Sequence, residues 1–180
     1  MCFFSMNPVV ARSLLSETGL TYGLRDIVIR PGTVADVDQI MAMHDRLSDA
    51  SLEKRYHRPW RPSREHMVSV CRLCGENGRL LVAELPGKQP KIIGMAYYVA
   101  EDAKTAEAAF LVEDRFQGQG IGKRLVHTLA RQAFARGIRF FDAHVLISNH
   151  AMIHLLARTG QMVHKKPDMG AYEMRVALEQ

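Results

Sequence analysis

A glycine-rich segment carries the residues best suited to chemistry, and it stands between an apolar stretch and a basic, amphipathic helical pattern. It consists of Gln117, Gly118, Gln119, Gly120, Ile121 and Gly122. The first N–H groups of a helix lack partners within the helix, and the helix dipole adds partial positive charge at the same end. Glycines at alternate positions also lack the Cβ atoms that would keep a bulky anion away from the backbone. The segment is therefore predicted to bind a phosphate group.

Two common phosphate-binding loops do not fit this segment. A Walker loop requires Ser or Thr after its Gly-Lys pair, whereas Gly122 and Lys123 precede Arg124. A dinucleotide-binding fingerprint requires Gly-x-Gly-x-x-Gly after the first strand of a parallel unit. Here the spacing is Gly-x-Gly-x-Gly, and the strands expected before it form an antiparallel pattern. An NTPase and a Rossmann enzyme are both disfavoured.

The segment resembles the signature of the GNAT superfamily of acetyl-CoA-dependent N-acyltransferases, Gln/Arg-x-x-Gly-x-Gly/Ala after an apolar strand. Gln117, Gly120 and Gly122 match this signature. A second pattern of the family, Asn-x-x-(Ala or Met)-x-x-Leu-x-x-x-x-Gly, is matched by Asn149, Met152, Leu155 and Gly160. The stretches LSDASLEKRYHRP and TAEAAFLVEDRFQGQGIGKRL are further similar to the catalytic domain of bacterial protein lysine acetyltransferases.

The resemblance implies acetyl-CoA as co-substrate and direct transfer without a metal. The strand before the loop would pair with the pantetheine arm, the amides from Gln117 to Lys123 would hold the pyrophosphate, and Asn149 would contact the pantetheine or order a nearby water. The implied cofactor-binding residues are Phe110, Leu111, Val112, Gln117, Gly118, Gln119, Gly120, Ile121, Gly122, Lys123, Asn149 and Met152.

Acetyl transfer to an amine requires a base, because a lysine amine with a pKa of about 10.4 is mostly protonated at neutral pH. By the resemblance, Glu107 is the expected general base, five residues before Val112. The small, apolar residues from Ala106 to Leu111 are expected to desolvate this carboxylate and make it a stronger base. A backbone N–H near Leu111 or Val112 would polarise the thioester carbonyl.

The residue type at the position of a second catalytic group differs from that in many GNAT enzymes. Many GNAT enzymes carry a tyrosine seven residues after the helix asparagine, where it protonates the departing thiolate. In this sequence Leu156 occupies that position. A thiol has a pKa of only about 8.5, so water is the expected proton source.

The spacing of apolar residues predicts the elements that position this loop. DIVIR from Asp26 is a strand, Thr33 caps a helix, and Ser63 opens a second helix that ends at Gly75. RLLVAEL, KIIGMAYYVAE and TAEAAFLV are three strands of an antiparallel meander. A helix follows Gly120, FFDAHVLI is a strand, Asn149 precedes a helix, and two strands flank the turn from Pro167 to Gly170.

Together with the resemblance, this order implies an α/β (α+β) GNAT fold. Its central sheet would be mixed but mostly antiparallel, with six to seven strands and about four flanking helices. Residues 25–180 are predicted to form this single domain, and residues 1–24 an N-terminal extension. The length of 180 residues and the hydrophobic content of 47% suit one buried core.

Composition limits the other classes of function. The formal net charge of +5 is a mild excess that favours anionic ligands or partners without demonstrating nucleic-acid binding. The N-terminus lacks the basic region of a signal peptide, and the chain contains no long apolar run, so a membrane protein is disfavoured. Three cysteines, two of them only three residues apart, do not suit a disulfide framework. A cytoplasmic location is therefore expected.

Several residue clusters have alternative explanations. The basic and aromatic stretch from Lys54 to Arg64 is compatible with single-stranded nucleic acid, but its similarity to the lysine acetyltransferases favours a structural or acceptor-binding role, with Arg55 and Tyr56 as candidates. Cys71 and Cys74 fall on an apolar helix face and are expected to be buried, not metal-bound. His150 and His154 have no evident third ligand, so no metal is predicted.

The resulting hypothesis is an enzyme that transfers acetyl from acetyl-CoA to a primary amine, most plausibly a protein lysine. The alternatives are a small-molecule amine N-acetyltransferase, a CoA-sensing domain without turnover, and a nucleic-acid-binding module. The identity of the acceptor, the acyl-chain preference, homo-oligomer formation and allosteric regulation stay open at this point.

Overall fold

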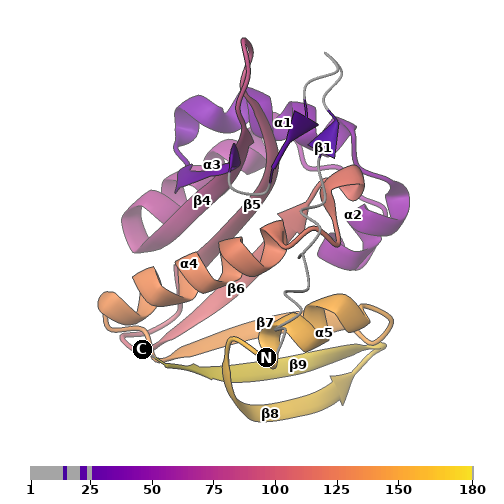
Figure 1. Ribbon diagram of the computed structural model, residues 1–180. Helices are drawn as coiled ribbons and strands as arrows, with labels where there is room; N and C mark the ends of the chain where they lie inside the picture. Colours follow the sequence, from indigo (N-terminus) through magenta and orange to yellow (C-terminus); the bar gives the residue numbers. More distant parts are fainter. Residues whose placement is uncertain (1–13, 16–20, 24–25, 180) are drawn as a thin grey trace, which may run out of the picture.

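The computed structural model describes residues 14–15, 21–23 and 26–179, and its centre is a seven-stranded sheet (Figure 1). The strand order is β3-β4-β5-β6-β7-β9-β8, and β6 and β7 form the one parallel pair in it. The strands are β3 (Val28–Pro31), β4 (Gly78–Leu85), β5 (Lys91–Ala100), β6 (Thr105–Val112), β7 (Phe140–Leu146), β8 (Gly160–Asp168) and β9 (Ala171–Leu178). The predicted mixed, mostly antiparallel sheet is confirmed.

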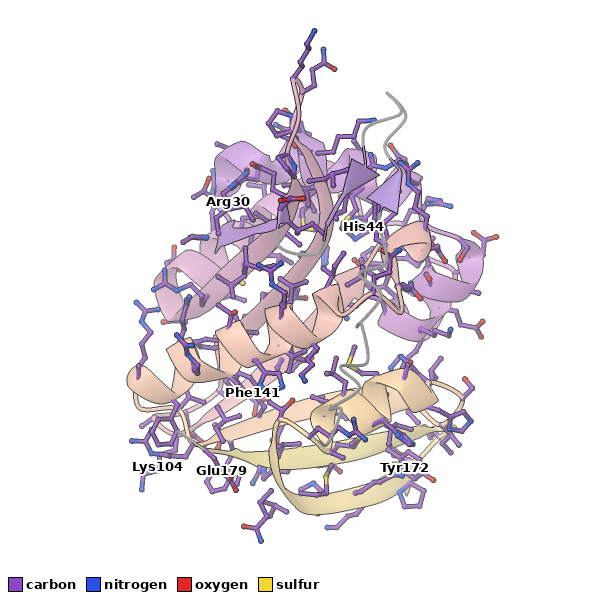
Figure 2. All side chains as sticks on the ribbon, viewed as in Figure 1. Arg30, His44, Lys104, Phe141, Tyr172 and Glu179 are labelled. Carbon is purple, nitrogen blue, oxygen red and sulfur yellow. The ribbon has the colours of Figure 1, made fainter. Side chains whose placement is uncertain are left out.

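Helices cover both faces of this sheet. One face carries α1 (Val37–Asp45), α2 (Asp49–Tyr56) and α3 (Arg64–Asn77), and the other carries α4 (Ile121–Ala135) and α5 (His150–Leu156). Each face has its own buried cluster. Leu111 belongs to the cluster beneath α1 and α3, whereas Phe110 and Phe141 belong to the cluster beneath α4 and α5 (Figure 2). Neighbouring residues of β6 therefore point to opposite faces, as a strand requires.

Side-chain caps fix the starts of the helices on the first face. Thr33 forms a capping box with Asp36 before a short 3-10 helix, η2 (Val34–Asp36), and Ser48 and Ser63 cap α2 and α3.

Two expectations about these helices are corrected by the structure. The helix from Ser63 continues past Gly75 to Asn77, because an exposed glycine within a helix is tolerated at modest cost. The stretch around Lys54, expected as part of a loop, forms the last turns of α2.

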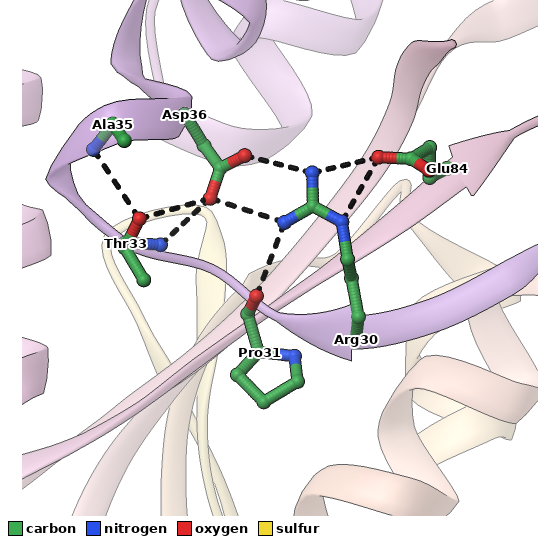
Figure 3. A network of polar contacts seen from close by, with 6 residues as sticks. All are labelled: Arg30, Pro31, Thr33, Ala35, Asp36 and Glu84. Atoms are coloured by element: carbon green, nitrogen blue, oxygen red, sulfur yellow. Dashed lines mark hydrogen bonds and ion pairs between the residues drawn. The ribbon is translucent and has the colours of Figure 1, made fainter.

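A polar network around Arg30 joins η2 to the edge of the sheet (Figure 3). The guanidinium of Arg30 donates to Asp36 at 2.7 and 3.1 Å and to Glu84 of β4 at 2.7 and 2.9 Å. Burial disfavours the Asp36 carboxylate, but hydrogen bonds from Arg30 and from the N–H of Thr33 outweigh burial and lower its pKa. The network therefore fixes α1 relative to β3 and β4.

The N-terminal segment is described only in part. Leu14–Leu15 (β1) pairs antiparallel with Thr21–Tyr22 (β2), and most of the predicted extension lies outside the described residues. Within the described part of the chain, no helix has the length and apolar character needed to cross a membrane.

Candidate active site

The central sheet opens between β6 and β7. Their pairing covers three positions, from Thr105 opposite Phe140 to Glu107 opposite Asp142, after which the two strands separate (Figure 1). β6 continues for five more residues along β5. The second half of β6 therefore presents one backbone edge to a space that another extended chain can occupy.

The hydrogen-bond pattern shows which residues of β6 face this opening. The N–H of Glu113 donates to the Ile93 carbonyl beside β5, whereas the carbonyl of Lys104 accepts from Phe140 of β7. Backbone N–H and C=O directions alternate along a strand, so the even-numbered residues face β7. The backbone groups of Phe110 and the N–H of Val112 thus point into the opening, while those of Leu111 point to β5.

Two cavities adjoin the opening and share five lining residues, so they form one cleft. The first, termed the loop cavity, has a volume of about 340 Å³ and borders the glycine-rich loop and the end of β6. The second, termed the Glu107 cavity, has a volume of about 360 Å³ and borders β6, β7 and the C-terminal end of α2. The shared residues are Lys54, Arg55, Phe110, Asn149 and Met152.

The loop cavity brings together most of the predicted cofactor-binding residues. These lining residues are Phe110, Leu111, Val112, Gln117, Gly118, Gly120, Gly122, Lys123, Asn149 and Met152. Gln119 and Ile121 do not line it. The Gln119 amide donates to the Arg115 carbonyl at 2.8 Å, and the Ile121 side chain is buried in the core beneath α4.

The N-terminus of α4 forms one end of the loop cavity. Gly118 and Gly120 have positive φ angles of 71° and 87°, a region that suits glycine. No side chain caps the helix at Gly120, so its first N–H groups are left for a ligand. Lys123 lines the cavity, whereas Arg124 donates to the Ile27 carbonyl at 2.9 Å. This end of the cleft suits a phosphate.

A polar junction that sequence reasoning missed ties the loop to α2. The Gln117 amide donates to the Val112 carbonyl at 2.9 Å and to the Ser51 hydroxyl at 3.1 Å. Asp114 accepts from the hydroxyls of Ser51 at 2.7 Å and Ser48 at 2.6 Å. Burial disfavours the Asp114 carboxylate, yet these serine hydrogen bonds outweigh burial and lower its pKa. The sequence analysis assigns no role to Ser48, and nothing in the sequence links Ser51 to Gln117.

Comparisons with known proteins agree with this geometry. The profile of the Acetyltransferase (GNAT) family matches residues 41–161. The chain belongs to this family. Acetyltransferase Pat of Mycolicibacterium smegmatis is 30% identical over 147 residues, which cover 79% of this chain and 43% of that protein. This GNAT chain therefore spans less than half the length of that relative.

Solved structures show the same fold. The GNAT domain of S. lividans PAT is 27% identical, with a TM-score of 0.72 and coverage of 93% of this chain and 97% of that domain. A putative acetyltransferase from Salmonella typhimurium, yncA, solved with its cofactor acetyl-CoA, is 19% identical, with a TM-score of 0.71 and coverage of 86% and 95%. The predicted GNAT fold and the resemblance to protein acetyltransferases are confirmed.

Glu107 lies where β6 leaves β7, and it lines the Glu107 cavity but not the loop cavity. By strand alternation its side chain projects on the same face of the sheet as Leu111, toward the side of α1 and α3. The side chain is exposed. The expectation that its apolar neighbours desolvate it is therefore wrong, because those neighbours point into the two cores instead.

The two predicted acceptor-binding residues have different surroundings in this GNAT structure. Arg55 is half-buried, donates to the Tyr97 hydroxyl, and places its guanidinium carbon 4.8 Å from the centroid of the Tyr56 ring. Tyr56 also lines the Glu107 cavity, and its hydroxyl is 2.8 Å from Nε2 of buried His44. The Tyr56 hydroxyl is therefore already hydrogen-bonded within the protein.

His44 is a buried residue whose role the sequence did not reveal (Figure 2). Its Nδ1 lies 2.8 Å from the Ile40 carbonyl, which can only accept, so Nδ1 carries the proton and Nε2 accepts from Tyr56. Burial lowers the pKa of His44 and raises the pKa of Tyr56 to about 12. Both side chains are therefore neutral at physiological pH, and their hydrogen bond holds α2 against α1.

Leu156 lines the Glu107 cavity, and Tyr56 is the one tyrosine among the described residues that lines either cavity. Tyr98 is buried against Phe141 instead. The Asn149 side chain accepts from the N–H of Met152 at 3.3 Å, so it caps α5 while bordering both cavities. Among the described side chains, therefore, no tyrosine hydroxyl takes the position that Leu156 occupies.

The metal and redox alternatives find no support among the described residues. No group of three His, Cys, Asp or Glu side chains in that part of the chain is arranged to hold an ion. Cys71 and Cys74 are buried as predicted, and burial raises their thiol pKa values to about 11 and about 12. His150 and His154 are exposed. Cys71 and Cys74 are therefore packing residues of the core beneath α1 and α3.

Proposed function

We propose that this protein transfers acetyl from acetyl-CoA to a primary amine, the side chain of a protein lysine, and that Glu107 is the general base. The observation that carries the proposal is the continuous cleft, which joins a phosphate-binding loop at one end to the Glu107 carboxylate at the other. The relationship to Pat and to the GNAT domain of S. lividans PAT supports a protein acceptor. We place the activity in residues 25–180 and in the cytoplasm, where buried free thiols such as Cys71 remain reduced.

The proposed binding mode follows from the backbone. The pyrophosphate of acetyl-CoA lies at the uncapped N-terminus of α4, beside Lys123, and the pantetheine arm extends along the open edge of β6 at Phe110. Because the Val112 and Phe110 N–H groups face this edge, they are placed to polarise the thioester carbonyl, whereas the Leu111 N–H faces β5. The sequence alone predicted a backbone N–H near Leu111 or Val112 for this role, and the proposal narrows that choice to Val112.

The chemical step then uses few groups. Glu107 accepts a proton from the lysine ammonium, directly or through water, and the neutral amine nitrogen attacks the thioester carbon. A C–N bond forms and the C–S bond breaks. The backbone N–H groups of β6 stabilise the oxyanion between these events. As the oxyanion collapses, the nitrogen releases its second proton to water. The thiolate leaves and takes a proton from water, because Leu156 cannot supply one.

The decisive experiment is a calorimetric titration with acetyl-CoA, followed by thiol release in the presence of lysine peptides and a panel of small amines. Saturable binding with CoA release driven by a lysine peptide supports the proposal. Release with small amines alone would instead identify a small-molecule N-acetyltransferase. Binding without release by any amine would indicate a CoA-sensing domain, and absence of binding would overturn the assignment of the glycine-rich loop.

A further inference from the structure

Arg55 differs from three other half-buried arginines of this protein. Arg30, Arg46 and Arg175 each form an ion pair with a carboxylate at 2.5 to 2.9 Å. In the part of the chain that the structure describes, Arg55 has no carboxylate within ion-pair distance, and the Tyr97 hydroxyl is its sole hydrogen-bond partner. Most of the N–H groups of this guanidinium are therefore available to an external acceptor.

The Arg55 guanidinium is also held in one place. Its carbon atom lies 4.8 Å from the centroid of the Tyr56 ring and 5.4 Å from that of Tyr97, and the Tyr97 hydroxyl accepts from Nη2. Tyr56 is in turn fixed by its hydrogen bond to buried His44. A fixed guanidinium loses less conformational entropy when it binds an anion than a free surface side chain does.

Two cationic side chains, Lys54 and Arg55, line the cavity at the end of α2. Glu107 is the one carboxylate among the described residues that line it. The nearest carboxylates on the adjoining strands are engaged elsewhere. Asp142 is bound by Arg175 at 2.5 and 2.7 Å, and Glu173 lies 3.7 Å from His164. The cavity thus offers one carboxylate for an amine and a separate cationic side for an anion.

Arg55 and Glu107 line the same cavity. Arg55 donates to the Tyr97 hydroxyl, and the strand that carries Tyr97 pairs with β6 at Val99 opposite Glu107. Burial raises the pKa of Tyr97, Arg55 acts to lower it, and Glu107 acts to raise it. An acceptor that contacts both residues carries an amine and an acidic group on the same molecule.

We propose that the preferred acceptors are lysines flanked in sequence by Asp or Glu, with the flanking carboxylate bound by Arg55 while the lysine amine approaches Glu107. This inference rests on the proposed acetyltransferase function and adds the chemical class of the acceptor. The guanidinium fork accepts a carboxylate in two parallel hydrogen bonds, which a neutral or basic neighbour cannot form. Arg55 is thus a specificity-determining residue.

The test uses three blocked peptides that differ only beside the lysine, with Asp, Asn or Arg in that position. We expect a kcat/KM at least about tenfold higher for the Asp peptide than for the Asn peptide, the scale of a charge-assisted hydrogen bond. In Arg55→Gln this ratio falls below about twofold, and in Arg55→Glu the Arg peptide becomes preferred. Arg58→Gln is the matched control, because Arg58 stacks on Trp60 at 5.2 Å and does not line the cavity.

The outcomes separate this inference from the proposed function. If all three peptides are acetylated equally well, the acceptor preference is overturned while the acetyltransferase function stands. A preference that persists in Arg55→Gln would also overturn it. A rise in the dissociation constant of acetyl-CoA in Arg55→Gln that matches its loss of activity would assign Arg55 to the co-substrate instead. If no peptide is acetylated although acetyl-CoA binds, the lysine acceptor itself is wrong and the inference falls with it.

Discussion

The two halves of the cleft are built from the chain in different ways. The loop cavity takes half of its lining from one continuous stretch, residues 110–123, and the groups proposed to bind an anion there are backbone N–H groups. The Glu107 cavity collects its polar groups from α2, β6 and β7, and their support comes from His44 of α1 and Tyr97 of β5. A local backbone motif can therefore bind the co-substrate, whereas the acceptor side depends on the packing of separate elements.

Removing the proposed base should give the largest effect. This effect should be confined to the acceptor side of the cleft. Glu107→Gln keeps the size of the side chain but cannot accept the amine proton. We expect turnover at neutral pH to fall by about 10²-fold or more, the usual scale for loss of a general base. Binding of acetyl-CoA should stay unchanged, because Glu107 does not line the loop cavity. Unchanged turnover with a lysine peptide would show that Glu107 is not the base.

A substitution in the glycine-rich loop should instead weaken binding of acetyl-CoA in the loop cavity. Gly120→Val adds a branched side chain at a φ of 87°, where it strains the backbone and obstructs the start of α4. We expect the dissociation constant of acetyl-CoA, measured by calorimetry, to rise by at least about tenfold.

Gly137→Val is the matched control for this prediction. Gly137 has a φ of 98°, nothing lies within 4 Å of its added Cβ, and it follows the far end of α4. The control should share the backbone strain but retain affinity for acetyl-CoA. Equal loss of affinity in both variants would attribute the effect to strain alone.

Ser51→Ala should test whether the two halves are connected. The Ser51 hydroxyl joins Gln117 of the loop to Asp114 and lies on α2, which also carries Arg55. We expect the KM for acetyl-CoA to rise about threefold to tenfold with a small change in kcat, because each hydrogen bond contributes about 1 kcal/mol. Ser51→Thr should restore much of the affinity. Ser69→Ala, which removes an exposed hydroxyl bonded to the Glu65 carbonyl, should have no effect on KM.

The buried His44 predicts an effect on stability instead of activity, namely a pH dependence of the free energy of unfolding. Burial lowers its pKa in the folded protein, so only the unfolded chain takes up a proton near pH 6.5. The free energy of unfolding should therefore be highest above that pH and decrease as the pH falls toward 5.

Urea unfolding at pH 7.5 and pH 5.0 measures this contribution. We expect the wild type to lose about 1 to 2 kcal/mol more than His44→Gln between these two values, given 1.36 kcal/mol per pKa unit. Equal losses in the two proteins would contradict the role of His44 as a neutral, buried support of Tyr56.

The sequence predicted the parts of this protein that depend on near neighbours along the chain. The strands from Arg79 to Val112, the cap at Ser63 and the helix after Gly120 follow from apolar spacing and from local backbone preferences. The helix that the sequence analysis missed also has a local explanation, the composition of its own segment. The stretch from Ser48 to Tyr56 is rich in charge and has little apolar periodicity, so its helix was missed, although Ser48 caps it and Leu52 anchors it in the core.

By itself, the sequence determined the order of the elements and the phosphate-binding loop, because backbone conformation and helix caps depend on residues only a few positions apart. Only the tertiary structure decided the separation of β6 from β7, the exposure of Glu107 and the network from His44 through Tyr56 to Arg55. These features join residues as far apart in the sequence as Thr105 and Phe140. Their geometry depends on how helices pack across the sheet, which no local pattern encodes.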